Sequence, residues 1–131
     1  MQKLEELIAA LEMADDLGTQ IMQDIMFACG IRDYDTAFHR ILKLVECGAQ
    51  IDAAVALLGR VKPGWFWRGG DVPVGKYERG EYQHGWAHIS KTDASNCDRD
   101  DEFTGWAATP VLALLIATLR ALAQEKTNAD K

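Results

Sequence analysis

The sequence predicts a single α+β domain, with helices first, a small antiparallel sheet next and one strongly apolar helix last. Three observations predict this order. Residues 1–59 repeat apolar side chains at helical spacing, residues 60–91 are rich in glycine and aromatic residues, and residues 109–124 are apolar nearly all round. A chain of 131 residues, of which 48% are hydrophobic, has the size and composition of one globular domain.

The first two helices are predicted from their apolar stripes. In the first, which we expect to reach about Asp16, apolar residues fall at i, i+3, i+4 and i+7 and therefore share one face. These residues are Leu4, Leu7, Ile8 and Leu11. The second helix is expected to begin at Thr19, a good capping residue, and to stop before Gly30, because glycine favours the left-handed conformation that ends helices.

Two more helices complete the helical part at residues 1–59. We expect the third to begin at Asp35 or Thr36, both of which can cap a helix, and to close at Gly48. The fourth follows at once and ends at Gly59, which stands where a left-handed residue is wanted. Its predicted apolar face is formed by Ile51, Val55 and Leu58, with help from Ala54.

Residues 60–91 predict a sheet of about three antiparallel strands with a Gly-rich hairpin. The expected strands are residues 65–67, 74–77 and 84–90. In the last strand, polar or aromatic residues alternate with Ala87 and Ile89, as in a strand that is covered on one side only. Residues 92–108 are polar and acidic and predict a loop.

The last helix is predicted at residues 109–124. Pro110 at the first helical position behind a Thr109 cap is a good start signal. The apolar residues that follow are Leu112, Leu115, Ile116, Leu119 and Leu122. Because apolar residues lie nearly all round this helix, we expect it to be the most buried element, and we expect residues 125–131 to form a frayed tail.

These patterns also predict the core. Its expected members are Leu7, Leu11, Ile25, Ile41, Leu42, Val55, Leu58, Trp65, Trp67, Trp86, Leu112, Leu115, Ile116 and Leu119. The tryptophans are included because aromatic rings next to a sheet usually pack it against a helix. On the same argument, we expect Trp106 to close the edge of the core.

Composition limits the expected partners and location. A net charge of −6 repels nucleic acid and anionic membranes. The three cysteines form no CxxC motif, which favours reduced thiols, and the N-terminal residues lack the pattern of a secretion signal. The most apolar stretch, residues 106–119, is shorter than the roughly 20 residues of a membrane span. We therefore expect a cytoplasmic protein that does not contact membranes.

Two motifs resemble the phage ABA sandwich family, small proteins encoded by phages and prophages. One is IDAAVALLGRVKPGWFWRGG, from Ile51 to Gly70, and the other is GWAATPVLALLIATLRAL, from Gly105 to Leu122. The resemblance implies an α-β-α sandwich, in which a small antiparallel sheet is flanked by helices. It also implies a location in the cytoplasm of the bacterial host. The family brings no established activity, catalytic residue or cofactor, and residues 1–50 match it less well.

The Gly-rich hairpin is the best candidate for a binding surface. Residues 60–91 hold six Lys and Arg residues against three Asp and Glu residues, so this segment is basic within an acidic chain. Aromatic rings beside Arg and Lys can receive a base, a nucleotide or a peptide. The candidate binding residues are Arg68, Lys76, Tyr77, Arg79, Tyr82 and His84. Nucleic acid is expected to bind only through this basic patch.

No motif predicts a catalytic residue, a metal or a cofactor. His84 and His88 precede Cys97, but strand residues four apart lie roughly 13 Å apart, too far to share a zinc ion. The carboxylates of residues 93–102 lack EF-hand spacing and indicate a solvated face, with a weak divalent-ion site or an acidic docking patch as alternatives. The cysteines and Ser90 stand in no recognisable nucleophile motif.

Together these observations favour a protein that binds without catalysis. With the resemblance, they suggest a phage or prophage accessory protein that acts on a host protein. One alternative is a protein that sequesters a small molecule or nucleotide in a pocket between the sheet and a helix, lined by Trp and Arg. The others are a structural or assembly component of the phage and a hydrolase that uses His84 or His88. A homo-oligomer is compatible with each of them.

Overall fold

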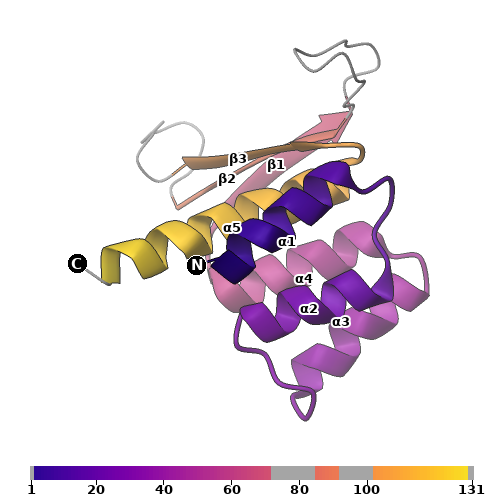
Figure 1. The fold of residues 1–131 in the computed structure, drawn as a ribbon. Coiled ribbons are helices and arrows are strands. Elements are labelled where there is room, and N and C mark those ends of the chain that lie inside the picture. The colour runs from indigo at the N-terminus through magenta and orange to yellow at the C-terminus, as the bar shows by residue number, and fades with distance from the viewer. Residues whose placement is uncertain (1, 72–84, 92–101, 130–131) are drawn as a thin grey trace.

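The computed structural model of the protein describes residues 2–71, 85–91 and 102–129. These residues form five helices and one sheet of three antiparallel strands, which confirms the α+β class (Figure 1). In chain order the elements are α1 (Gln2–Met13), α2 (Thr19–Ala28), α3 (Thr36–Glu46), α4 (Gln50–Val61), β1 (Phe66–Asp71), β2 (Gly85–Ser90), β3 (Glu102–Ala107) and α5 (Pro110–Ala129). No helix of the described residues is long and apolar enough to cross a membrane.

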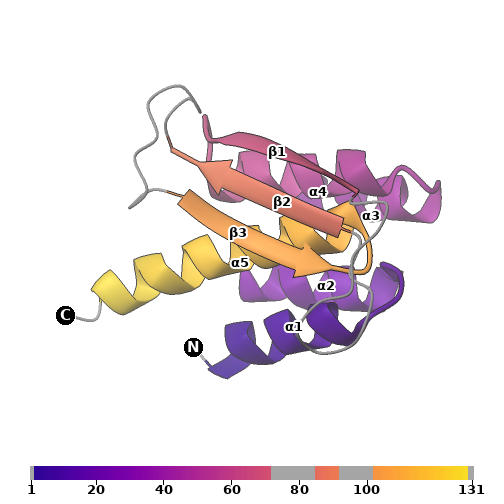
Figure 2. The ribbon, with the colours of Figure 1, turned by 90° about the horizontal axis from the view of Figure 1, so that it is seen from above.

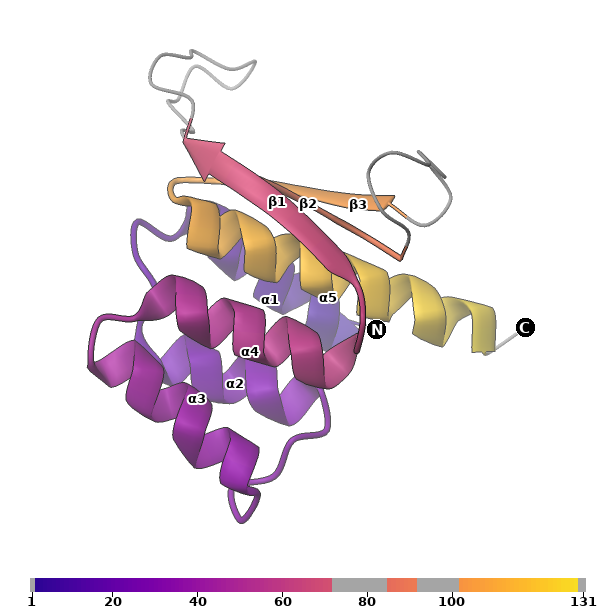
Figure 3. The same ribbon diagram turned by 180° about the vertical axis from the view of Figure 1, so that it is seen from behind.

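The helices lie in layers on one side of the sheet. Helix α5 packs directly on the sheet, mainly under β2 and β3, and α1 runs beside it (Figures 1 and 3). Helix α4 contacts α5 from the side away from the sheet, and α2 and α3 complete the outer helical layer. Over the described residues, the opposite side of the sheet therefore carries no helix.

Helix α5 is the centre of the molecule, as its sequence predicts. All nine residues from Val111 to Leu119 are buried, and they contact both the sheet and the surrounding helices. Thr118 is the buried polar residue of this stretch, and its hydroxyl donates a hydrogen bond to the Leu114 carbonyl at 2.9 Å. The helix is longer than expected, because it continues to Ala129 where the sequence suggested a frayed tail from residue 125.

Two glycines allow α5 to lie so close to the sheet. A Cβ atom at Gly105 in β3 would lie 2.0 Å from the carbonyl oxygen of Ala113 in α5. A Cβ atom at Gly85 in β2 would lie 2.1 Å from the carbonyl carbon of Thr109, just before the helix begins. Since these obstacles are backbone atoms, only glycine fits at either position.

The N-terminal helices confirm most of the predicted boundaries. Gly30 and Gly48, both with φ of +83°, follow α2 and α3 as the closing glycines. Each glycine allows a hydrogen bond that closes the helix end. After α2, the Ile31 amide donates to the Met26 carbonyl at 2.9 Å, and after α3 the Ala49 amide donates to the Leu44 carbonyl at 2.8 Å. This pattern is the Schellman motif.

Helix α4 differs from its prediction. Gly59 lies inside the helix, and the left-handed glycine after it is Gly64, with φ of +82°. The buried face comprises Ala53, Ala54, Leu57 and Leu58, whereas Ile51 is 38% exposed and Val55 is only partly buried. The prediction is therefore confirmed for Ala54 and Leu58 and wrong for Ile51, which lies at the outer surface of a helix that contacts α3 and α5.

The sheet has the order β1-β2-β3, and both neighbouring pairs are antiparallel. The alternation predicted for residues 84–90 is confirmed, because β2 alternates buried with half-buried residues along its length. The expected strand at residues 74–77 lies outside the described residues. Strand β3 was missed, since it falls within the segment predicted as an acidic loop. Its inward positions include Gly105 and Ala107, which are too small to give an apolar signal.

The core prediction for the tryptophans was wrong for three of the four, because Trp86 also lies on the face of the sheet that points away from α5. Trp67 and Trp106 are 37% and 39% exposed, whereas Trp65 is packed partly against the core and Trp86 is half-buried. Trp67 is on an edge strand that α5 hardly covers, and Trp106 belongs to the face of β3 that points away from the helices. The exposed rings therefore come from their positions in the sheet, which the local sequence does not reveal.

Candidate functional site: the outer face of the sheet

Strand alternation divides the sheet into two faces. Ala87 and Ile89 of β2 and Ala107 of β3 are fully buried on the inner face against α5. The register then assigns the neighbouring positions to the outer face, which Figure 2 views from above. These outer positions are Phe66, Arg68, Gly70, Trp86, His88, Ser90, Glu102, Thr104 and Trp106. No helix of the described residues covers this face (Figure 2).

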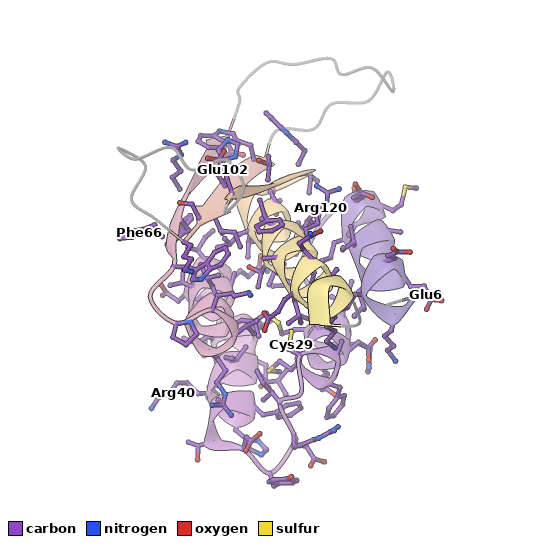
Figure 4. The ribbon with its side chains drawn as sticks, turned by 90° about the vertical axis from the view of Figure 1, so that its left-hand side faces the viewer. Glu6, Cys29, Arg40, Phe66, Glu102 and Arg120 are labelled. Carbon is purple, nitrogen blue, oxygen red and sulfur yellow. The ribbon has the colours of Figure 1, made fainter. Side chains whose placement is uncertain are left out.

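Three aromatic side chains lie on the outer face. Phe66 is 50% exposed and Trp106 is 39% exposed, and Figure 4 shows Phe66 pointing away from the body of the protein. Trp86 stands directly opposite Trp106 across the β2–β3 pair. Its indole also covers Gly70 on the other side, since a Cβ atom there would be 3.6 Å from the indole nitrogen. Phe66 lies apart from this pair, at the other end of the face beside Ser90. Exposed aromatic side chains on an uncovered face are typical of a recognition surface.

A polar row crosses the middle of the same face. Arg68, His88 and Thr104 are register partners on the three strands. The Nδ1 atom of His88 lies 2.7 Å from the hydroxyl oxygen of Thr104 and 3.6 Å from a carboxylate oxygen of Glu102. The Trp86 ring lies 5.2 Å from the imidazole ring, centroid to centroid. These contacts hold the imidazole in one orientation at a half-buried position.

Of the candidate binding residues, the structure describes one. Arg68 is exposed on β1, next to His88 in the polar row. Lys76, Tyr77, Arg79, Tyr82 and His84 lie outside the described residues. The sequence reasoning missed the other members of the face. Trp106 was assigned to the edge of the core, Glu102 and Thr104 to a loop, and Phe66 only to a strand, because only the register brings the three strands together.

The described residues offer little support for catalysis or metal binding. Burial raises the pKa of the Cys29 thiol to about 11 and outweighs the opposing effect of the Lys126 charge. A thiol with this pKa is almost entirely protonated near neutral pH and is a poor nucleophile. Cys47 is exposed, and of His84, His88 and Cys97 only His88 lies within the described residues. Over the described ranges, no three His, Cys, Asp or Glu residues are grouped as metal ligands.

A surface depression of about 380 Å³ lies between the starts of α4 and α5. It is lined by Gly48, Ala49, Gln50, Ile51, Asp52, Thr109, Pro110 and Val111. The alternative of a protein that sequesters a small molecule or nucleotide requires a pocket between the sheet and a helix, with Trp and Arg in its walls. This depression has a different location and contains neither residue type, so it does not correspond to that pocket.

Comparisons with known proteins give no family assignment. No family model, no curated protein and no solved structure matches the chain. The resemblance to the phage ABA sandwich family therefore stays a prediction.

Proposed function

We propose that this protein acts by binding another protein, without catalysis, through the outer face of its sheet. The observation that supports this most directly is the exposure of Phe66 and Trp106 on a face that carries no described helix. Aromatic residues and Arg are enriched in the centres of protein interfaces, where they contribute most of the binding free energy. Arg68 stands between the two aromatic positions, on the same face.

The charge of the face also fits a protein partner. Arg68 and Glu102 place one charge of each sign on the face, so the described part has no strongly basic character. The whole chain carries a net charge of −6, which opposes binding to a polyanion. A mixed surface of aromatic and oppositely charged side chains is suited to a folded protein partner.

The biological setting is part of the same proposal. The two motifs that resemble the phage ABA sandwich family support a phage or prophage accessory protein, and a host protein is then the natural target. There are two alternatives, binding of a small ligand and a structural role in the phage. The identity of the bound molecule distinguishes them from the main proposal: a host protein supports the proposal, whereas a small ligand or a phage protein supports an alternative.

The experiment compares what the wild-type chain and two variants capture from a bacterial lysate. Phe66→Ala/Trp106→Ala removes the exposed rings of the outer face. Tyr34→Ala is the matched control, because Tyr34 is 81% exposed in the turn between α2 and α3, far from the sheet. A protein retained by the wild type and the Tyr34 variant, but lost from the double variant, supports the proposal. Equal capture by a folded double variant contradicts it.

A further inference from the structure

Strand β1 lies at an edge of the sheet and is open to solvent. Phe66, Trp67, Arg68 and Gly69 are all exposed, and so is Asp71. The exposure of Gly69 is exposure of its main chain, since glycine has no side chain. An edge strand with accessible N–H and C=O groups is a template for pairing with a further strand.

The contact at Gly69 shows which main-chain groups face outward. A Cβ atom at Gly69 would lie 2.7 Å from the carbonyl oxygen of Trp86, so this oxygen points from β2 toward β1. In an antiparallel pair this makes Gly70 and Trp86 a hydrogen-bonded pair and leaves Gly69 and Ala87 as a non-hydrogen-bonded pair. The N–H and C=O groups of Trp67, Gly69 and Asp71 therefore point away from the sheet.

The opposite edge supports this assignment and shows what a covered edge looks like. The same alternation directs the carbonyl of Thr104 outward from β3, and Arg120 donates a hydrogen bond to it at 2.7 Å. The other guanidinium nitrogen of Arg120 lies 3.2 Å from a carboxylate oxygen of Glu12 in α1. At the edge of β3, Arg120 therefore binds an outward carbonyl and is itself held by Glu12 of α1. Among the described residues, no hydrogen bond is made to the outward main-chain groups of β1.

We propose that the β1 edge binds an extended segment of a partner protein as a fourth strand. This inference rests on the proposed function and specifies how the partner is held. Trp67 points to the inner face beside this edge and is 37% exposed, so it offers an apolar contact to the nearest inward residue of the added strand. Arg68 points to the outer face and attracts an acidic residue. The preferred segment therefore carries an apolar residue beside Trp67 and an acidic residue beside Arg68.

A second copy of the chain fits this edge less well. Antiparallel pairing of two β1 strands places both helical layers on the same side of the joined sheet, and α4 already lies on that side of β1 (Figures 3 and 4). Pairing centred on Arg68 would also set two guanidinium groups opposite each other, which is destabilising. Each copy carries a net charge of −6. A single extended segment avoids the first two costs.

The test uses displayed random peptides as the probe. Peptides selected on the wild-type chain are measured against Trp67→Ala and Trp67→Pro, which both remove the indole, while only proline removes the outward N–H. Losing that hydrogen bond and leaving a partner carbonyl unpaired is expected to weaken binding by about tenfold relative to Trp67→Ala. Selected peptides should share an apolar residue next to an acidic residue, matching Trp67 and Arg68. Equal affinities for the two variants, or no enrichment of any peptide, would overturn the proposal.

Amide hydrogen exchange on the wild-type chain provides a test that does not depend on a variant. In the free protein, the amides of Trp67, Gly69 and Asp71 should exchange faster than those of Arg68 and Gly70, and a bound peptide should slow the first three. Protection of those three in the free protein, or a dimer in solution that protects them, would contradict the inference. If Trp67→Pro loses peptide binding while Phe66→Ala/Trp106→Ala binds fully, the β1 edge is the binding site and the proposed role of the outer face is rejected. If Phe66→Ala/Trp106→Ala loses binding while Trp67→Pro binds fully, only the strand-addition proposal is rejected.

Discussion

Gly105→Ala is expected to destabilise the protein strongly, because the added methyl group meets helix backbone. Its Cβ atom would lie 2.0 Å from the Ala113 carbonyl oxygen, 2.9 Å from the carbonyl carbon and 3.1 Å from the Ala117 nitrogen. Real Cβ contacts are essentially never shorter than 3.0 Å, so α5 must move away from β3 by about 1 Å. Overpacking usually costs about 1–3 kcal/mol, and we expect at least the upper end because no side chain can rotate away.

Gly70→Ala is the matched control. It places the same methyl group in the sheet, but its nearest neighbour would be the Trp86 indole nitrogen at 3.6 Å, an ordinary contact. The expected change in the free energy of unfolding is within about 1 kcal/mol of zero. Urea denaturation of both variants measures the difference. If Gly105→Ala lost no more stability than Gly70→Ala, the close packing of α5 on β3 would be refuted.

Three further predictions concern single side chains of the helices. The thiol of Cys29 should resist alkylation near neutral pH while exposed Cys47 reacts, as peptide mapping would show; fast labelling of Cys29 in the folded chain would argue against its burial. Because burial raises the pKa of Cys29 from 9.0 to about 11, this group should favour the folded state below pH 9 and lose that contribution between pH 9 and 11. Arg120→Met should cost about 1–3 kcal/mol, since it leaves the outward carbonyl of β3 without its donor. Arg40→Met, at an exposed position of α3, should change the free energy of unfolding by less than about 0.5 kcal/mol, and equal losses in the two arginine variants would contradict the role of Arg120.

The elements that could be predicted are those whose signals are local. Gly30 and Gly48 end α2 and α3 because their positive φ angles are a property of the residue itself. Pro110 marks the start of α5 for the same kind of reason, and the apolar residues of that helix predict its burial. In each of these cases, a few neighbouring residues determine the structure.

The errors have a common physical origin in long-range pairing. Strand β3 has small inward residues, so only its pairing with β2 defines it as a strand. Trp67 and Trp106 have the size of core residues, but one is on the open edge and the other on the open face. Arg68 could be named from its charge and position in the sequence. Its neighbours in the candidate site come from β2 and β3, at distances in sequence that local patterns do not bridge.

The central claim is that the outer face of the sheet is a protein-binding surface. Nuclear magnetic resonance mapping of a captured partner on the isotope-labelled chain tests it most directly, because the indole N–H signals of Trp86 and Trp106 report from that face. We predict that these signals and the amide signals of β1 shift on binding. Shifts confined to the depression between α4 and α5, at residues such as Ile51 and Val111, would contradict the account.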